Sequence, residues 1–228
     1  MNKIILALDT TNIDEAIAIT EKIKDKIFTV KLGLEFFNAH GKEGIRKFNQ
    51  IGIKNLMLDL KLKDIPETVY KSIKALDDIE FGYLTIHGLG GKEMIRKAKQ
   101  AASENKCKPN IMMVTILTTL NDADLKDMGV NNSVTQQVEK LTSIAKEMEV
   151  GVVCSGLEAK IVRKILGTNF LIFTPGIRLI NNQNDDQKRV CTPLESIRNG
   201  SDKIIMGRSL INGNVDENLN KIYNSLKT

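Results

Sequence analysis

The sequence predicts an α/β protein with the (β/α)8 TIM-barrel fold, formed as a single domain over residues 1–228. Eight short apolar runs recur along the chain, amphipathic helical patterns separate them, and polar residues stand at the end of most runs. Apolar strands joined through helices are typical of a parallel sheet covered on both faces. Eight such repeats favour closure of the sheet into a barrel, and a barrel of this length commonly forms one domain.

The strands are predicted, in chain order, at residues 3–9, 28–33, 55–61, 83–88, 110–117, 151–156, 170–176 and 203–207. The segments between them carry apolar residues at helical spacing, for example at positions 13, 16, 17, 20 and 23. Thr11 or Asn12 can cap the first helix, and Asp216 with Glu217 suits the start of the last. An open doubly wound sheet is the alternative, but Asp9-Thr-Thr-Asn stands where that fold would carry its glycine fingerprint.

The composition narrows the classes of function. A net charge of +5 could attract nucleic acid or a phosphorylated ligand, but Lys and Arg alternate with Asp and Glu along the helical stretches, which indicates solvated faces. A phosphorylated small molecule needs only one basic pocket. No apolar run approaches the length of a membrane span. Because Cys107, Cys154 and Cys191 lack metal-site or disulfide spacing, we expect a protein of the reducing cytoplasm that binds neither nucleic acid nor membrane.

Catalytic groups of a (β/α)8 barrel come from the C-terminal ends of several strands, so those ends should carry polar residues. The predicted strands end, in order, at Asp9, Lys31, Asp59 with Lys61, His87, Thr115 with Thr118, Ser155, Arg178 and Arg208. The strand starts carry far fewer. This asymmetry predicts an active site at one mouth of the barrel.

The segment 55–68 is the most informative part of the chain. Asp59 and Lys61 are two residues apart, so strand alternation turns both to one face and leaves Leu58, Leu60 and Leu62 on the other. Burying the two charges costs several kcal/mol unless they pair with each other or with a charged ligand, which indicates chemistry. The alternative is a surface ion pair on an edge strand, worth about 0–1 kcal/mol.

Two arginines follow the last two strands, where barrels frequently bind phosphate. Arg178 and Arg208, together with the backbone of Gly207, can form a bidentate anion site. The alternative is that each arginine covers the barrel rim through its apolar stem. Residues 179–190 are polar and lack a helical pattern, which predicts a mobile lid over a bound phosphate.

Other polar residues are less specific. We expect His87 to be a hydrogen-bonded structural histidine and His40 to lie on a helix or loop surface. Thr118 and Ser155 could either hydrogen-bond a heterocycle or cap the next helix.

Six motifs occur in order at the predicted strand ends: Leu6-Ala-Leu-Asp9, Val30-Lys31-Leu-Gly, Asp59-x-Lys61-x-x-Asp64-Ile-Pro-x-Thr68, Leu117-Thr118, Thr174-Pro-Gly-Ile-Arg178 with Asp186-Gln187, and Met206-Gly-Arg208. Together, over about residues 2–226, they resemble the bacterial orotidine 5′-phosphate decarboxylase family. The resemblance implies a dimeric (β/α)8 barrel that converts orotidine 5′-monophosphate to UMP and carbon dioxide in pyrimidine synthesis. It also implies that the reaction uses no metal and no organic cofactor.

The resemblance further implies roles for individual residues. Lys61 would protonate C6, Asp59 would face the departing carboxylate, and Lys31 would complete an alternating row of charges. Asp64 and Thr68 would reach into the site of the neighbouring subunit. The substrate-binding residues would be Asp9 for the ribose, Thr118 for the pyrimidine, and Arg178, Gln187, Gly207 and Arg208 for the phosphate end. His87-Gly-Leu-Gly-Gly91 departs from the family's His-Ala-Ser-Gly-Gly, so His87 is assigned no role.

Two other functions stay open. A sugar-phosphate decarboxylase or aldolase of the same barrel class would use a similar Asp-x-Lys-x-x-Asp run to hold Mg²⁺, with Glu35 as the nearby candidate for an extra carboxylate ligand. A non-catalytic basic nucleic-acid-binding protein is suggested only by the net charge. The sequence lacks the concentrated basic segment and interleaved aromatic residues that such a protein would carry.

Overall fold

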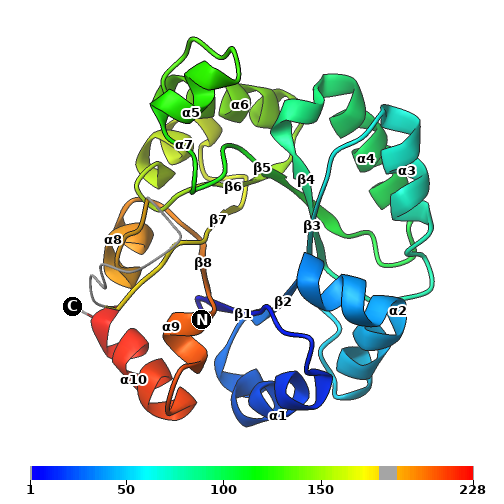
Figure 1. The fold of residues 1–228 in the computed structure, drawn as a ribbon, viewed down its shortest axis with the longest axis vertical. Helices are drawn as coiled ribbons and strands as arrows, with labels where there is room; N and C mark the ends of the chain where they lie inside the picture. The colour runs from blue at the N-terminus through cyan, green and yellow to red at the C-terminus, as the bar shows by residue number, and fades with distance from the viewer. Residues whose placement is uncertain (1, 180–188, 228) are drawn as a thin grey trace.

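The computed structural model describes residues 2–179 and 189–227. Within them, parallel strands close into a barrel in chain order, with β8 paired to β1 (Figure 1). The strands are β1 (Ile4–Leu8), β2 (Thr29–Gly33), β3 (Met57–Leu62), β4 (Tyr83–His87), β5 (Asn110–Val114), β6 (Gly151–Val153), β7 (Ile172–Thr174) and β8 (Lys203–Met206). The predicted barrel is confirmed. The predicted fifth, sixth and seventh strands extend beyond the observed ones, the fifth because the chain bends at Ile116 and leaves the barrel wall.

Helices surround the barrel (Figure 1). They are α1 (Ile13–Ile23), α2 (Leu34–Gln50), α3 (Pro66–Lys74), α4 (Lys92–Glu104), α5 (Asp122–Asp127), α6 (Val134–Glu147), α7 (Ala159–Leu166), α8 (Pro193–Arg198), α9 (Arg208–Ile211) and α10 (Val215–Ser225), with 3-10 turns η1 (Lys24–Lys26) and η2 (Gly88–Gly90). Asn12 caps α1 by accepting a hydrogen bond from the Glu15 N–H. Asn214 caps α10, and Asp216 with Glu217 lies in its first turn, where carboxylates interact favourably with the helix dipole.

The buried apolar residues form two layers. The larger layer lies between the strands and the helices and includes Leu6, Leu58, Leu60 and Leu84. The smaller layer fills the barrel interior and consists of Ile5, Ala7, Met57, Tyr83, Met112, Val114, Val153, Phe173 and Ile205. Because strand side chains alternate between faces, the residues that follow Met57 on the inward face are Asp59 and Lys61. The apolar interior therefore gives way to charged residues toward the C-terminal ends of the strands.

The N-terminal end of the barrel is closed by aromatic rings. Tyr83 lies 5.1 Å from Phe173 and 5.8 Å from Phe28, measured between ring centroids. The Lys203 ammonium lies 3.9 Å from the Phe28 ring centroid and donates a hydrogen bond to the Asn2 carbonyl. This packing leaves the opposite end as the open one.

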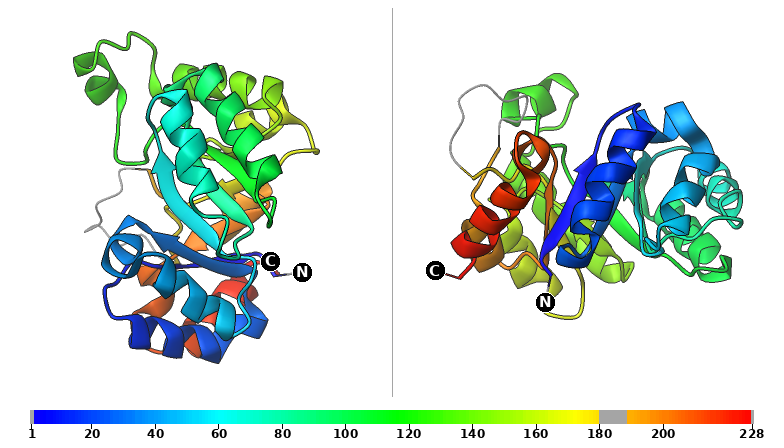
Figure 2. Two further views of the ribbon diagram at one scale, coloured as in Figure 1. Left: turned by 90° about the vertical axis from the view of Figure 1, so that its right-hand side faces the viewer. Right: turned by 90° about the horizontal axis from the view of Figure 1, so that it is seen from below.

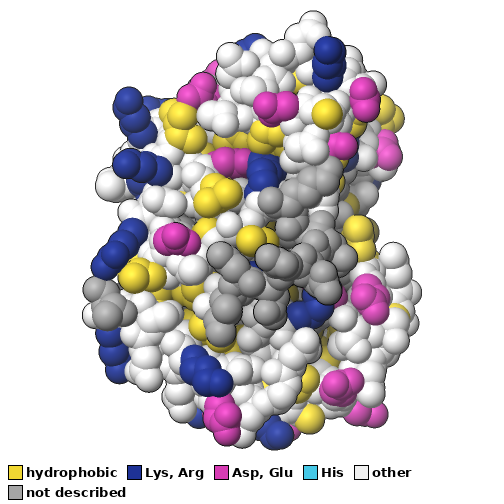
Figure 3. All heavy atoms as spheres, turned by 60° about the vertical axis from the view of Figure 1, so that its left-hand side comes forward, with side chains coloured by type: hydrophobic (Ala, Val, Ile, Leu, Met, Phe, Trp, Pro, Cys, Tyr) yellow, Lys and Arg dark blue, Asp and Glu magenta, His cyan; other side chains and the backbone are white. Residues whose placement is uncertain are grey.

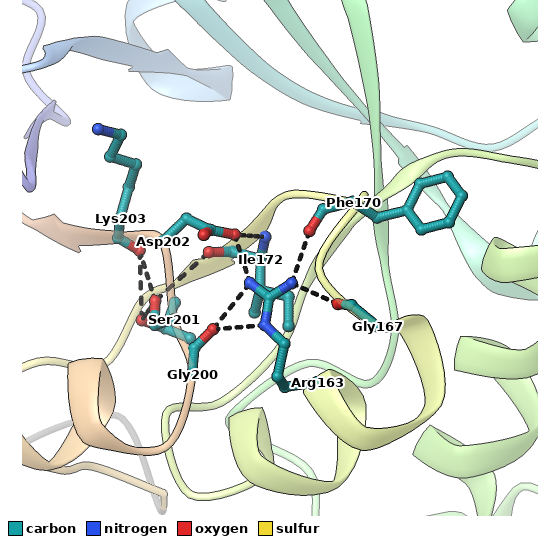
Figure 4. A network of polar contacts seen from close by, with 9 residues as sticks. Arg163, Gly167, Phe170, Ile172, Gly200, Ser201, Asp202 and Lys203 are labelled. Atoms are coloured by element: carbon teal, nitrogen blue, oxygen red, sulfur yellow. Dashed lines mark hydrogen bonds and ion pairs between the residues drawn. The ribbon is translucent and has the colours of Figure 1, made fainter.

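Polar contacts of Arg163, which lies on α7, tie together the segments that enter β7 and β8 (Figure 4). Its guanidinium donates hydrogen bonds to the carbonyls of Gly167, Phe170 and Gly200 and pairs with Asp202 at 2.6 Å. Asp202 also accepts a hydrogen bond from the Ile172 N–H. These contacts lie at the N-terminal end of the barrel, so they stabilise the barrel without touching its open mouth.

Two orthogonal views show α5 and its flanking loop projecting beyond the barrel at the end opposite the start of β1 (Figure 2). This is the end at which the strands terminate. Among the described residues, the helices are all too short or too polar to cross a membrane.

Candidate active site

A cavity of about 770 Å³ opens at the C-terminal ends of the strands. This volume lies within the range of small-molecule sites. Eight of the predicted site residues line it: Asp9, Lys31, Asp59, Lys61, Thr118, Arg178, Gly207 and Arg208. The cavity therefore has charged residues at its floor and two arginines on the side of β7 and β8.

The floor of the cavity carries a row of alternating charges. Lys31 Nζ lies 3.2 Å from Asp9 Oδ1 and 3.2 Å from Asp59 Oδ2. Lys61 Nζ lies 2.8 Å from the same Asp59 oxygen. Lys31 and Asp59 are buried, whereas the side chains of Lys61 and Asp9 are partly exposed toward the cavity. The row thus runs Asp9, Lys31, Asp59, Lys61, with its outer members accessible to a ligand.

The electrostatics of the row keep its buried members charged. Burial would raise the pKa of Asp59, but the ammonium groups of Lys31 and Lys61 and a hydrogen bond from Thr85 together lower that pKa to about 2. Burial would lower the pKa of Lys31, yet the carboxylates of Asp59 and Asp9 outweigh it, so this pKa is raised. Charge pairing therefore offsets the desolvation of both groups.

The backbone of strand β3 departs from the regular strand geometry that the sequence analysis assumed. Its register with β4 shifts between Leu58 and Leu62, so β3 advances four residues while β4 advances two, from Leu84 to Ile86. Lys61 lies in this irregularity with φ of 45°, a left-handed conformation that is uncommon for a residue with a side chain. Asp59 and Lys61 do share the inward face, as predicted. The irregular backbone, which costs about 1–3 kcal/mol, was not foreseen.

Gly33 provides room for the row. A Cβ at this position would lie 2.8 Å from Asp9 Oδ1 and 3.3 Å from Lys31 Nζ. Both distances are shorter than ordinary van der Waals contacts. A side chain at position 33 would therefore displace the first two members of the row.

The predicted anion site lies on the opposite wall. Arg178 follows β7, and Arg208 begins the short helix α9 after β8, with Gly207 between strand and helix. A Cβ on Gly207 would lie 3.3 Å from the Ala7 carbonyl oxygen, so the backbone there passes close to β1. Both arginines and Gly207 line one cavity, an arrangement suited to a doubly charged anion.

Three predicted residues do not belong to this lining. Asp64 and Thr68 are exposed and lie outside the cavity wall that the structure describes. Ile65, which lies between them in the sequence, is 67% exposed. Gln187, and with it residues 180–188 of the predicted lid, lies outside the described residues.

The remaining polar strand ends, and His40 on α2, have hydrogen-bond partners. His87 Nδ1 accepts a hydrogen bond from the Leu89 N–H, and His40 Nε2 lies 2.9 Å from the Thr11 carbonyl oxygen. Burial, followed by the charges of Lys63 and Lys61, lowers the pKa of His87. The Ser155 hydroxyl accepts from the Leu157 N–H. Burial raises the pKa of Cys154, which also lines the cavity, to about 12, so its thiol is uncharged at neutral pH.

Sequence reasoning missed two elements of the site. Thr85, fully buried on β4, donates to Asp59 Oδ1 at 2.9 Å and accepts from the Lys61 N–H at 2.8 Å. Arg189, near the end of the predicted lid, pairs with buried Glu158 and donates to the carbonyls of Ile116 and Leu117. The sequence did offer one signal for Thr85, because it is a single threonine at an inward position of an otherwise apolar strand. The Arg189 contacts join residues 31 or more apart and left no local pattern.

The donor set favours ammonium groups over a metal in the row. Lys31 bridges the carboxylates of Asp9 and Asp59, and Lys61 pairs with the same Asp59 oxygen as Lys31. Glu35 lines the cavity but is exposed. Among the described residues, His, Cys, Asp and Glu side chains form no group of three suited to a metal ion. On the face in Figure 3, Lys and Arg side chains are interspersed with Asp and Glu rather than gathered into one basic patch.

Comparison with known proteins agrees with this geometry. A sequence model of the Orotidine 5'-phosphate decarboxylase / HUMPS family matches residues 2–220. The chain belongs to this family. A family member from Wolbachia pipientis subsp. Culex pipiens, named orotidine 5'-phosphate decarboxylase, is 44% identical over 211 residues, which are 92% of each chain. A second decarboxylase of that name, from Wolbachia sp. subsp. Brugia malayi, is 41% identical and covers 96% of both chains.

A solved structure of the decarboxylase family supports the fold assignment. The crystal structure of orotidine 5'-phosphate decarboxylase from Lactobacillus acidophilus superposes with a TM-score of 0.86 at 32% identity and covers 100% of both chains. The similarity therefore extends over the barrel as a whole, including the strand ends that carry the charged row.

Proposed function

We propose that this protein decarboxylates orotidine 5′-monophosphate to UMP and carbon dioxide in pyrimidine biosynthesis. The observation that carries the proposal is the charged row, which ends in an accessible ammonium on Lys61 within a cavity of about 770 Å³ that two arginines also line. Membership of the orotidine 5'-phosphate decarboxylase / HUMPS family, with relatives of that name above 40% identity, supports the same reaction.

The chemistry requires a fixed cation beside C6 of the pyrimidine. When the bond from C6 to the carboxylate breaks, carbon dioxide leaves and the electron pair stays on C6 as a vinyl carbanion that the ring cannot delocalise. The Lys61 ammonium stabilises this charge and then donates a proton to form the C6–H bond, after which the amine takes a proton from solvent. At about 4 Å and an effective dielectric near 20, one such ion pair is worth on the order of 4 kcal/mol.

Lys31 and Asp59 hold the charges of the row in place, and Asp59 faces the departing carboxylate. The row is fixed before the substrate arrives, so no side chain has to reorganise as charge moves from the carboxylate to C6. No metal and no organic cofactor takes part in this proposal, because the cation that the reaction needs is already covalently attached to the protein.

The remote groups of the substrate bind away from C6. Arg178, Arg208 and Gly207 hold the phosphate, with Gln187 as a further contact, while Asp9 binds the ribose and Thr118 the pyrimidine. Binding energy from an unreacting phosphate can stabilise the closed, desolvated arrangement in which C6 meets Lys61.

We further propose a cytoplasmic homodimer in which Asp64 and Thr68 complete the partner's site. The exposed side chain of Ile65 supports a contact surface here, together with exposed Leu34 and Leu89 at the starts of the segments after β2 and β4. These three apolar side chains follow neighbouring strands, so they gather at the same end of the barrel as the cavity. That residues 1–228 act as a single domain stays a prediction.

A decarboxylation assay tests the reaction and the proposed independence from metal together. Loss of orotidine absorbance should proceed equally with and without EDTA. A complete loss of activity with EDTA that Mg²⁺ restores would instead support a metal-dependent sugar-phosphate enzyme of the same barrel class. Salt-sensitive retention on random DNA without turnover of any nucleotide would support a nucleic-acid-binding protein.

Mixing two inactive variants tests the shared site. In a mixed dimer of Lys61→Ala and Asp64→Ala, crossing of Asp64 leaves one site with both mutations and the other intact. Random reassortment should then restore about a quarter of wild-type activity, because about half of the dimers are mixed and each has one good site of two. Absence of any rescue in a sample proven to contain mixed dimers would contradict the crossing.

A further inference from the structure

We infer that Thr85 is a positioning residue that fixes the Asp59 carboxylate and the strained Lys61 backbone through one shared hydroxyl. This inference rests on the proposed decarboxylation and deepens it, because it concerns how the charged row is held in the geometry that the reaction requires.

The backbone of β3 creates the need for such a residue. Where the register of β3 and β4 shifts, the Lys61 N–H loses the regular ladder partner that a β4 carbonyl would supply. A backbone donor in this interior must find another acceptor, since leaving it unpaired is costly. The Thr85 hydroxyl takes that position at 2.8 Å. β-Bulges next to active sites commonly re-aim a side chain, and here the bulge directs Lys61 into the cavity.

The same hydroxyl has one proton to donate, and the carboxylate of Asp59 receives it. Thr85 Oγ1 lies 2.9 Å from Asp59 Oδ1, while both lysines approach the other oxygen, Oδ2. Because the hydroxyl accepts from the amide, its single proton is directed to the carboxylate. The carboxylate is therefore held with one oxygen toward Thr85 and the other toward the two ammonium groups.

Burial makes this arrangement rigid. Thr85 has 0% exposure, and its strand neighbours Leu84 and Ile86 are equally buried on the opposite face. A β-branched side chain in a strand has few rotamers available, so few positions are open to the hydroxyl oxygen. The charged and titratable groups that face Asp59 are Lys31 from β2 and Lys61 from β3, with Asp9 beyond Lys31 and His87 two residues along β4.

Thr85→Val and Thr85→Ser distinguish positioning from packing. Valine keeps the shape but removes the hydroxyl, whereas serine keeps the hydroxyl. For Thr85→Val we expect kcat to fall about 10- to 100-fold, and the affinity for a UMP analogue with an oxyanion at C6 to fall in parallel. Affinity for UMP itself should change less than about twofold. Thr85→Ser should recover kcat to within about threefold of wild type, since its hydroxyl can make both hydrogen bonds.

The pH profile separates this role from a loss of stability. Because the hydroxyl hydrogen bond helps to lower the pKa of Asp59, the acid limb of kcat/KM should move to higher pH in Thr85→Val and return in Thr85→Ser. Thr142→Val is the matched control: Thr142 is equally buried and donates one hydrogen bond within α6, to the Val138 carbonyl. It should lower the melting temperature without moving the pH profile.

The possible outcomes are separable. If wild-type protein turns over orotidine 5′-monophosphate but Thr85→Val keeps normal kcat and an unmoved acid limb, the positioning role is wrong while the proposed function stands. If wild-type protein has no such turnover, the proposed function fails first. Should Thr85→Val not fold, Thr85→Cys replaces the hydroxyl by a thiol, a weaker donor and acceptor, and its kcat should fall below that of Thr85→Ser; equal kcat in the two variants would contradict the positioning role.

Discussion

Lys61 Nζ lies 2.8 Å from Asp59 Oδ2, although the backbone between and around the two residues departs from a regular strand. The pair is fixed from two sides: Lys31 holds the same carboxylate oxygen, and Thr85 holds the other oxygen together with the Lys61 amide. A cation anchored in this way can face a developing carbanion without first changing its position.

Replacing Lys61 should separate catalysis from binding. Lys61→Ala is expected to reduce kcat by roughly 1000-fold or more while UMP affinity stays largely intact, because the cation is needed most after the carboxylate leaves. Absorbance assays and calorimetric titration with UMP measure the two quantities. Lys54→Ala, which alters an exposed lysine before β3, is the control. Near-normal turnover in Lys61→Ala would rule out Lys61 as the proton donor.

Replacing Arg208 should affect only phosphorylated ligands. Arg208→Ala is expected to weaken UMP binding by about 10- to 100-fold, because a charge-assisted hydrogen bond is lost, and to leave uridine binding almost unchanged. Titration with both ligands gives the ratio of the two dissociation constants. Arg96→Ala, at an exposed arginine on α4, should change neither. Equal weakening of UMP and uridine would place Arg208 outside the phosphate pocket.

The depressed pKa of Asp59 predicts how stability depends on pH. A carboxyl whose pKa falls from 3.8 to about 2 on folding stabilises the protein above pH 3.8, and this contribution is lost as the pH falls through about 2. This contribution to the free energy of unfolding is on the order of 2 kcal/mol. Urea unfolding between pH 4.5 and 3 should therefore show a steeper loss in wild type than in Asp59→Asn. Parallel curves would mean that Asp59 titrates alike in the folded and unfolded chain.

Gly33 should tolerate no side chain. Gly33→Ala places a methyl group 2.8 Å from Asp9 Oδ1, so Asp9 and Lys31 must separate. We expect kcat/KM to fall by roughly tenfold or more, with a loss of stability near 1–3 kcal/mol from overpacking. Steady-state kinetics and urea unfolding measure these effects. Gly52→Ala is a useful comparison because a Cβ there meets open space. Its φ of 92° adds backbone strain, so this variant should lose stability without a change in kcat. Unchanged kinetics in Gly33→Ala would show that the row adapts.

The Arg163 network should matter for stability alone. Arg163→Ala removes hydrogen bonds to three carbonyls and leaves Asp202 without its charge partner, so we expect a loss of about 2–4 kcal/mol in the free energy of unfolding. Arg46→Ala, which breaks a surface pair with Asp78, should cost less than about 1 kcal/mol. Thermal unfolding and kcat are the measurements. A change in kcat of the purified, folded variant would contradict the separation of the two ends.

The sequence alone identified the parts of this protein whose signals are local. Eight apolar runs predicted the strands, and the polar residues that end them predicted the mouth of the barrel, because strand direction fixes which end of a parallel sheet a terminal residue reaches. The spacing of Asp59 and Lys61 placed both on the inward face, since alternation depends only on backbone geometry.

Tertiary structure decided the contacts that join distant segments. The two carboxylates that share Lys31 come from the residue after β1 and from β3, and the hydroxyl that holds Lys61 comes from β4, so no spacing along the chain could reveal either contact. The left-handed backbone of Lys61 is likewise set by a mismatch between two strands rather than by the residue itself. Local sequence specifies which face a side chain occupies, but only the closed sheet brings those faces within hydrogen-bonding distance.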